Sequence, residues 1–191
     1  IPEWFIESCK KISYLFPRAH AVAYVMMAFR IAWFKVYHPL AFYAAYFSIR
    51  AKAFDLRIMT GDLKTQLTEF NRIKALDRAA SPKDKDLMSA LEVSMEMYQR
   101  GYRFINVDIQ HSEARRFSIK DGALLPPFLA IDSLGETVAD AIVEERNERP
   151  FTSLKDLQRR CKVSNTIIDL MKDLKCCGEL PEDEQMSLFG A

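Results

Sequence analysis

A group of basic residues and one aromatic residue near the N-terminus has the composition of a phosphate-binding site. The stretch reads Phe16-Pro17-Arg18-Ala19-His20-Ala21-Val22-Ala23-Tyr24, and two lysines precede it. Proline has no N–H and cannot continue an incoming helix, so we expect a new helix to begin near Arg18. The first N–H groups of a helix lack internal partners, and the helix dipole adds about half a positive charge there. This arrangement favours a phosphate, although solvated basic residues at a helix start give the same pattern. The candidates are Lys10, Lys11, Arg18 and His20, with Tyr24 as a stacking residue.

A second candidate site lies at a turn that leads into a helix. Ile131-Asp132-Ser133-Leu134-Gly135 predicts a tight turn, and residues 136–143 predict the helix. Glycine adopts backbone conformations that other residues resist, so we expect Gly135 to let the turn aim its N–H groups outward. Together with the helix N-terminus, such N–H groups hold a DNA phosphate without reading sequence. The candidates are Ser133, Leu134, Gly135 and Thr137. The alternative is an ordinary corner between two helices.

Long apolar helices are expected to carry the first site. A first helix should run from Pro2 to Phe16-Pro17, a second from about His20 to His38, and a third from Leu40 to about Lys52. The second and third are apolar on nearly every side, which predicts burial in a core or in a membrane. Charged residues at 30 and 35 disfavour a membrane span, because a charge near the bilayer centre costs about 2.5 kcal/mol or more.

The middle of the chain predicts two amphipathic helices. Thr60 is expected to cap the first, with apolar residues at positions 63, 67, 70 and 73. Ser81-Pro82-Lys83-Asp84 combines a cap, a proline at the first position and an early carboxylate, and so predicts the start of the second. Gly101 should end it. The expected buried stripe of this helix is Met88, Leu91, Met95 and Tyr98.

The periodicity changes after residue 101. Apolar residues alternate with polar ones over 105–109, which is typical of a strand, and 117–119 predicts a second strand followed by a hairpin turn at 120–122. Further along, Ser153 should cap a helix over 154–160, and Ser164 another over 165–175. We therefore expect a boundary near residue 102, between a helical part and a small mixed part that contains two helical hairpins. An acidic linker and the short apolar segment 185–189 follow.

Charge is segregated along the chain. Residues 1–60 hold 8 Lys and Arg against 3 Asp and Glu, although the formal net charge of the 191 residues is +1. This indicates an anionic partner for the first third of the chain. The four cysteines contain no C-x-x-C pair, which favours buried thiols in a reducing compartment. No secretory signal opens the chain, and the start at Ile1 without a methionine suggests a piece of a longer protein.

The combined pattern resembles bacterial replicative DNA polymerase III α subunits of the PolC type. The residues that carry the resemblance are Trp4-Phe5 to Cys9-Lys10-Lys11-Ile12, the Phe16 to Val25 stretch, Arg30-Ile31-Ala32, Phe34-Lys35 and His38-Pro39-Leu40, which are similar to the fingers of that family. Arg18 stands where the family usually has lysine. Residues 124–178 resemble the tandem helix-hairpin-helix region that follows the fingers, with Ser133 in place of the usual first glycine. The tail Gln185, Met186, Ser187, Leu188 and Phe189 resembles the family's clamp-binding peptide, with Met186 in place of leucine.

The resemblance implies a fold, a function and partners. The implied fold is mainly α: helical fingers over 1–101, a small α(+β) helix-hairpin-helix domain that binds duplex over 102–178, and a flexible linker with a clamp-binding peptide over 179–191. The implied function is template-directed DNA synthesis in the cytoplasm, with deoxynucleoside triphosphates, primer-template duplex and the sliding clamp as partners and no membrane. In that family Mg²⁺ is bound by palm carboxylates, which this stretch lacks, so no catalytic or metal-binding residue is expected here.

Two other interpretations stay open. The first is a non-catalytic DNA-binding or scaffold module that uses the same helix-hairpin-helix region. The second is a membrane-associated helical protein built on residues 21–52.

Overall fold

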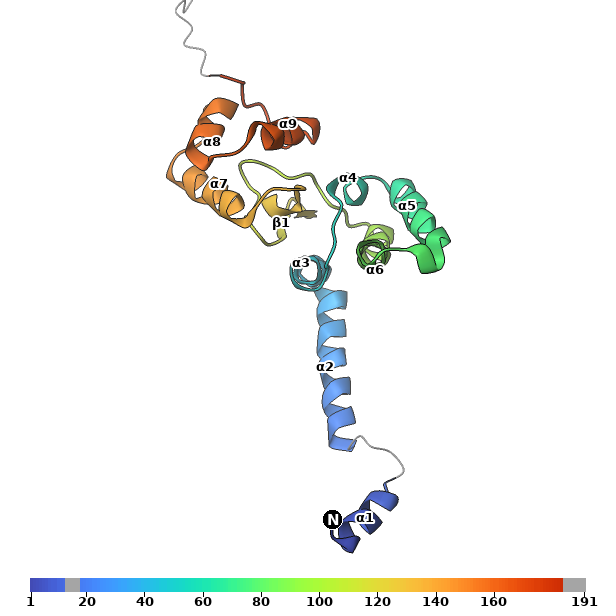
Figure 1. Ribbon diagram of the computed structural model, residues 1–191. Coiled ribbons are helices and arrows are strands. Elements are labelled where there is room, and N and C mark those ends of the chain that lie inside the picture. Colours follow the sequence, from blue (N-terminus) through green and yellow to red (C-terminus); the bar gives the residue numbers. More distant parts are fainter. Residues whose placement is uncertain (13–17, 184–191) are drawn as a thin grey trace, which may run out of the picture. The chain divides into compact units, whose positions relative to one another are not determined.

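The computed structural model describes residues 1–12 and 18–183, and this part of the chain is mainly helical (Figure 1). In order, the elements are α1 (Glu3–Lys10), α2 (Arg18–Tyr37), α3 (Pro39–Ile49), α4 (Leu56–Met59), α5 (Leu63–Leu76), η1 (Asp77–Ala79), α6 (Pro82–Gln99), β1 (Ser118–Lys120), β2 (Ala123–Leu125), η2 (Phe128–Ala130), α7 (Glu136–Glu148), α8 (Leu154–Cys161) and α9 (Asn165–Asp173). The expected fold class, helical with a small sheet component, is confirmed. Packing divides the chain into two compact units, Ile1–Phe42 and Tyr43–Ala191.

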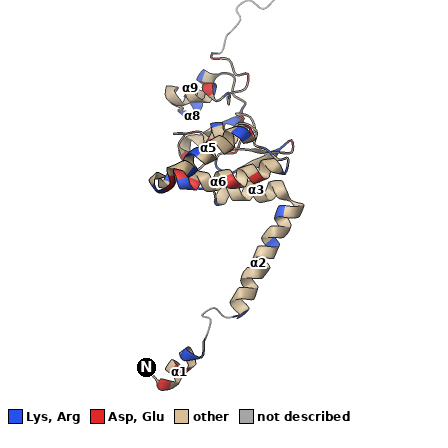
Figure 2. Cartoon of the chain, turned by 90° about the vertical axis from the view of Figure 1, so that its right-hand side faces the viewer, with Lys and Arg blue, Asp and Glu red and all other residues tan. Residues whose placement is uncertain are grey.

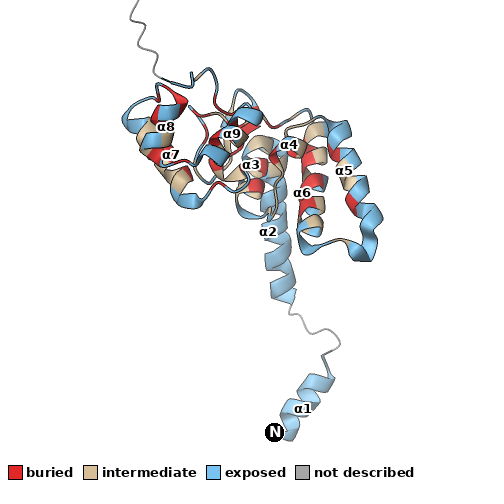
Figure 3. Cartoon of the chain, turned by 45° about the horizontal axis from the view of Figure 1, so that its top comes forward, coloured by how far each residue is buried: buried red, intermediate tan, exposed pale blue. Residues whose placement is uncertain are grey.

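The first unit consists of α1, α2 and the start of α3. Helix α1 ends at Lys10, earlier than expected, whereas α2 and α3 begin and end within about three residues of the expected positions. Neither α1 nor α2 has a buried residue among those described (Figure 3). The prediction that α2 is buried in a core is therefore wrong for the described part of this chain. The charged residues of α2 are all basic (Figure 2).

Helix α2 also has the dimensions of a membrane span. Among the helices of residues 1–12 and 18–183, it is the one that is long and apolar enough to cross a bilayer by length and composition. Arg30 and Lys35 lie within it.

The second unit begins with the remainder of α3, from Tyr43, and continues with a small helical layer formed by α4, α5 and α6. Thr60 does not cap a helix N-terminus as expected: it ends α4, and its hydroxyl donates to the Leu56 carbonyl at 2.6 Å. The N-cap of α5 is Asp62, whose carboxylate accepts from the Thr65 N–H at 2.8 Å. The fully buried Gln66 connects the layer, donating to a carbonyl at the end of α4 and accepting from Ser94 of α6 at 2.6 Å.

The start and end of α6 are as predicted, but its buried face is not. Ser81 and Asp84 form a reciprocal capping box, and Gly101 follows the helix with a φ of 86°. Of the expected buried stripe, Met88, Leu91, Met95 and Tyr98, only Leu91 is fully buried. The buried residues are Leu87, Ala90, Leu91, Ser94 and Met97.

An aromatic cluster joins α3 and the segment after it to the residues that lead into the small sheet. The cluster consists of Phe47, Phe54, Phe104 and Phe117, with ring centroids 4.9 to 6.2 Å apart. Strands β1 and β2 pair antiparallel through the predicted turn, in which Asp121 and Gly122 have φ values of 50° and 73°. The cluster packs residues from both sides of position 102 within the second unit, which begins at Tyr43. The domain bounds expected from the sequence, 1–101, 102–178 and 179–191, stay a prediction.

The segment 105–109 is not a strand. The preceding Phe104 forms an isolated bridge to Leu124, and the Ile105 N–H donates to the Leu124 carbonyl at 2.9 Å. Val107 and Ile109 are nevertheless buried, and the Ile109 N–H donates to the Cys176 carbonyl at 3.2 Å. The alternation of polar and apolar residues therefore reflects a segment with one buried side that is not part of a regular sheet ladder.

All four cysteines are free. Cys161, Cys176 and Cys177 are buried as expected, whereas Cys9 is exposed. Burial raises the pKa of Cys161 to about 11 and that of Cys176 to about 12. Because the thiolate is the reactive form, these two thiols are inert packing groups at neutral pH.

Candidate nucleic-acid interface

The first helical hairpin is a short turn that connects η2 to α7. The side chains of Ile131 and Leu134 are buried and hold the turn to the core. The Leu134 N–H donates to the Ile131 carbonyl at 3.2 Å. Between them, Asp132 and Ser133 are exposed. Ser133 has a φ of 64°, in the left-handed region that favours glycine. The turn is therefore fixed by two apolar anchors and one strained residue, and its tip faces outward.

Gly135 does not have the role that the sequence suggested. Its φ of −76° and ψ of 156° are ordinary extended values, so the left-handed residue of the turn is Ser133 and not the glycine. Gly135 is the N-cap of α7 and supplies no side-chain cap bond. A Cβ placed on it would meet no atom within 4 Å. The missing side chain thus leaves open space in front of the first-turn N–H groups of α7, where an anion is stabilised.

The surface around this turn is rich in carboxylates. Asp132 and Glu136 are exposed, and Asp140 lies one helical turn further along α7. The Arg115 guanidinium donates two hydrogen bonds to Asp140, at 3.1 and 2.5 Å, and one to Glu136 at 2.6 Å. The hydrogen bond from Arg115 lowers the pKa of Asp140. Arg115 is a residue that the sequence analysis missed, because it approaches the hairpin from 21 residues away.

The second hairpin repeats the geometry of the first. Lys162, which ends α8, has a φ of 54°; the next residue, Val163, is buried; and Ser164 is the N-cap of α9. The order of left-handed residue, buried apolar residue and N-cap is the same as in Ser133-Leu134-Gly135. The caps differ, because the Ser164 hydroxyl accepts from a first-turn N–H of α9 at 3.4 Å. Backbone donors are therefore more available in the first hairpin, and the second presents an exposed lysine instead.

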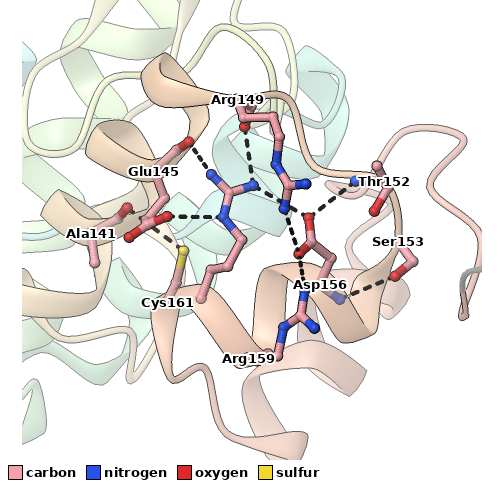
Figure 4. A network of polar contacts seen from close by, with 9 residues as sticks. Ala141, Glu145, Arg149, Thr152, Ser153, Asp156, Arg159 and Cys161 are labelled. Carbon is pink, nitrogen blue, oxygen red and sulfur yellow. Dashed lines mark hydrogen bonds and ion pairs between the residues drawn. The ribbon is translucent and has the colours of Figure 1, made fainter.

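A buried carboxylate holds the second hairpin together (Figure 4). The Asp156 side chain is fully buried and accepts hydrogen bonds from Arg149 at 3.3 Å, Arg159 at 2.9 Å and Arg160 at 3.3 Å. The Thr152 N–H also donates to it at 3.3 Å. Burial alone would raise the pKa of Asp156, but these donors outweigh it and lower the pKa. The carboxylate thus remains charged although it is removed from water.

Arg160 extends this network to α7. It donates to the Glu145 carboxylate at 2.8 Å and to the Arg149 carbonyl at 3.1 Å, and its guanidinium lies 4.8 Å from the Phe151 ring centroid. Its side chain is largely buried. The network therefore fixes α8 against the end of α7.

The basic N-terminal candidates lie on exposed positions of two helices. Lys10 ends α1 and Lys11 follows it, while Arg18 and His20 open α2 and are exposed as expected. The His20 ring packs edge-on against Tyr24, with centroids 4.7 Å apart. The two halves of this candidate site are separated by residues 13–17, which include Phe16-Pro17 and lie outside the described residues. The structure therefore brings His20 and Tyr24 together but does not join the lysines to them.

Two further expectations concern the tail and metals. The clamp-binding candidates Gln185, Met186, Ser187, Leu188 and Phe189 lie outside the described residues. Within residues 1–12 and 18–183, no group of three or more His, Cys, Asp or Glu residues is placed to hold a metal ion.

Comparison with known proteins finds a motif in the second half of the chain and relatives that match almost all of it. The family model of the helix-hairpin-helix motif matches residues 101–185. The chain is 48% identical over 189 residues to the DNA polymerase III PolC-type of Caldanaerobacter subterraneus subsp. tengcongensis, covering 99% of this chain and 14% of that protein. It is 46% identical over 192 residues to the DNA polymerase III PolC-type of Streptococcus pyogenes and 48% identical over 191 residues to that of Streptococcus suis. It spans 13% of each of these two relatives. The resemblance to PolC-type polymerases is confirmed.

Proposed function

We propose that this chain is the part of a PolC-type replicative DNA polymerase that binds the nucleic acid and the incoming nucleotide, while residues elsewhere perform the transfer. The observation that carries the proposal is the similarity to these polymerases, which extends over almost the whole chain. In this view the polymerase is a DNA-directed nucleotidyltransferase that works in the bacterial cytoplasm.

The first hairpin is proposed to hold the backbone of the primer-template duplex. Gly135 leaves open space before the α7 N-terminus, Ser133 and Leu134 form the turn before it, and Thr137 lies in the first turn of α7. Backbone N–H groups contact phosphates without reading bases, which suits an enzyme that must move along any sequence. The second hairpin contributes the exposed Lys162 at the corresponding position.

The basic residues of the first unit are proposed to meet the phosphates of the incoming deoxynucleoside triphosphate or the template. Lys10, Lys11, Arg18 and His20 are exposed, as such contacts require, and Tyr24 beside His20 offers a stacking face. An Arg in place of a Lys at position 18 keeps the charge but presents a planar fork, which suits two oxygens of one phosphate.

Mg²⁺ is proposed to serve the complete enzyme from a site on residues outside this chain. Phosphoryl transfer needs metal ions between the attacking and leaving oxygens. The carboxylates near the first hairpin are not gathered for this purpose, since Asp140 is paired with Arg115 and Asp132 is an exposed residue of the turn. This chain alone is therefore expected to bind DNA without extending a primer.

Helix α2 is proposed to pack against the remainder of the polymerase. It is apolar on nearly every side and has no buried residue in the described chain, so it needs an apolar partner. The chain spans only 13–14% of its relatives, so such a partner is available in the complete protein. The tail Gln185 to Phe189 is proposed to bind the sliding clamp, which raises the effective concentration of the enzyme at the primer end.

A non-catalytic DNA-binding module is the second candidate, because the helix-hairpin-helix match covers residues 101–185 alone. Kinetic measurements on the complete protein that contains this chain distinguish the two candidate functions, the polymerase and the non-catalytic module. Lys10→Gln and Arg18→Gln should raise the KM for deoxynucleoside triphosphates about tenfold, with Arg57→Gln, a basic residue of the second unit, as the control. An unchanged KM in both variants would remove the nucleotide contact. Absence of any polymerase activity in the complete protein would favour the non-catalytic module.

A further inference from the structure

We infer that Arg115 is a phosphate contact of the duplex interface, and that Glu136 is the partner from which it is released when DNA binds. The inference rests on the proposed binding of duplex by the first hairpin. It concerns a side chain that precedes the hairpin in sequence and that no motif marks.

The backbone places Arg115 at the hairpin by direct pairing. The Phe128 N–H donates to the Glu113 carbonyl at 2.9 Å, and the Leu129 N–H donates to the Ala114 carbonyl at 3.1 Å. These two bonds fix the residues just before Arg115 against η2, the segment that leads into the turn. The backbone therefore holds Arg115 near the N-terminus of α7, independently of the contacts that its side chain makes.

The two carboxylates hold the guanidinium unequally. Asp140 receives two hydrogen bonds, from Nε and Nη2, in the fork geometry that gives the strongest arginine pairs. Glu136 receives one, from Nη1, and its side chain is 66% exposed against 36% for Asp140. An exposed ion pair with a single bond contributes little free energy, so it is the contact with Glu136 that opens first.

Glu136 occupies the place that a phosphate would need. It is the first residue of α7, directly after Gly135, and its carboxylate is stabilised by the helix N-terminus in the absence of DNA. A phosphate that approaches the open space at Gly135 meets this like charge and the Arg115 guanidinium together. When the phosphate replaces the carboxylate on Nη1, the exposed Glu136 side chain turns away into solvent, which lowers the repulsion, and Arg115 stays anchored by Asp140.

The test is duplex binding by the full chain, measured over a salt series with fluorescently labelled primer-template DNA. Glu136→Gln should strengthen binding about threefold, because the competing charge is removed. Arg115→Gln should weaken binding and lower the slope of log K against log salt by about one, as expected for one lost phosphate contact. In the Arg115→Gln background, Glu136→Gln should give a smaller gain than it gives alone.

Matched controls come from another arginine–glutamate ion pair in the same unit. Arg72 and Glu69 lie 2.6 Å apart on α5, so Arg72→Gln and Glu69→Gln make the same charge changes away from the hairpin. Glu136→Gln leaves the Arg115–Asp140 pair intact, so its result does not depend on how well the arginine variant folds. If the variants at positions 115 and 136 bind duplex as their controls do, and Gly135→Val still weakens binding, the inference is overturned but the proposed function is not. A wild-type chain that does not bind duplex would overturn the proposed function and the inference with it.

Discussion

Ser133 and Lys162 occupy the same position in two successive helical hairpins, with φ values of 64° and 54°. Each is followed by a buried apolar residue and then by the N-cap of a helix. Both are non-glycine residues in a conformation that favours glycine, so both turns carry backbone strain that the surrounding packing maintains.

Relief of that strain should stabilise the protein. Ser133→Gly is expected to raise the free energy of unfolding by about 0.5–1 kcal/mol, because glycine adopts a positive φ at no steric cost. Urea unfolding followed by circular dichroism measures this. Ser89→Gly, at an exposed position inside α6, is the matched control and should lower stability by about 0.5 kcal/mol. Equal effects at the two positions would argue against strain at Ser133.

A side chain at position 135 should block the duplex without harming the fold. Gly135 has a φ of −76° and open space at its Cβ position, so Gly135→Val is expected to fold normally. The valine would occupy the proposed phosphate position and weaken duplex binding about tenfold in a titration. Thermal unfolding of the same sample checks the fold, and unchanged affinity would remove the hairpin from the interface.

An added charge on the same surface should act in the same direction. Thr137→Glu places a carboxylate on the exposed first turn of α7 and should weaken duplex binding several-fold at low salt. Thr68→Glu makes the same change on exposed α5 and should leave binding unchanged. If both variants bind alike, net charge and not position explains any loss.

Loss of the buried carboxylate should be among the most destabilising single changes in the second unit. Asp156→Asn leaves Arg149, Arg159 and Arg160 without their shared partner and is expected to cost about 3 kcal/mol of unfolding free energy. Asp169→Asn, at an exposed position on α9, is the control. A cost below about 1 kcal/mol would show that the network contributes no more free energy than an ion pair on the protein surface.

The same carboxylate makes stability depend on pH. The pKa of Asp156 is lowered in the folded protein, so its contribution is fully present above the unfolded value of about 3.9 and is lost as the pH falls towards the folded pKa. The stability difference between wild type and Asp156→Asn should therefore shrink below about pH 4. A difference that stays constant down to pH 3 would contradict the lowered pKa.

Deletion of the tail should separate clamp binding from duplex binding. A chain that lacks residues 185–189 is expected to lose retention on an immobilised sliding clamp while its duplex affinity is unchanged. Leu188→Ala with Phe189→Ala should reproduce the loss, and Ser187→Ala should not, because apolar side chains fill such pockets. Retention of the deleted chain would exclude this segment as the clamp contact.

Local signals explain most of what the sequence predicted correctly. Ser81, Ser153 and Ser164 each accept from an N–H three residues ahead, so the signal and the structure it produces lie within one turn. Thr60 failed as a cap because Asp62, two residues later, serves the same purpose, and because the four-residue α4 has too few positions to show a periodicity.

Long-range contacts explain what could not be predicted. The buried phase of α6 is shifted by one residue because its partner presents Gln66, which accepts from Ser94 at a separation of 28 residues. Arg115 has no local signal at all, since its carboxylate partners lie 21 and 25 residues away. The hairpin itself was predicted, but the exchange of roles between Ser133 and Gly135 depends on backbone angles that residue types alone do not fix.

The bare surface of α2 has a consequence for anyone who handles this chain alone. Phe29, Trp33 and Val36 are each at least half exposed to solvent, on a helix with no buried residue in the described chain. Such a surface lowers its free energy by meeting another copy of itself, so purified chains should self-associate as concentration rises. Light scattering against concentration would reveal this, and a quantitative DNA titration belongs below the concentration at which the scattering begins.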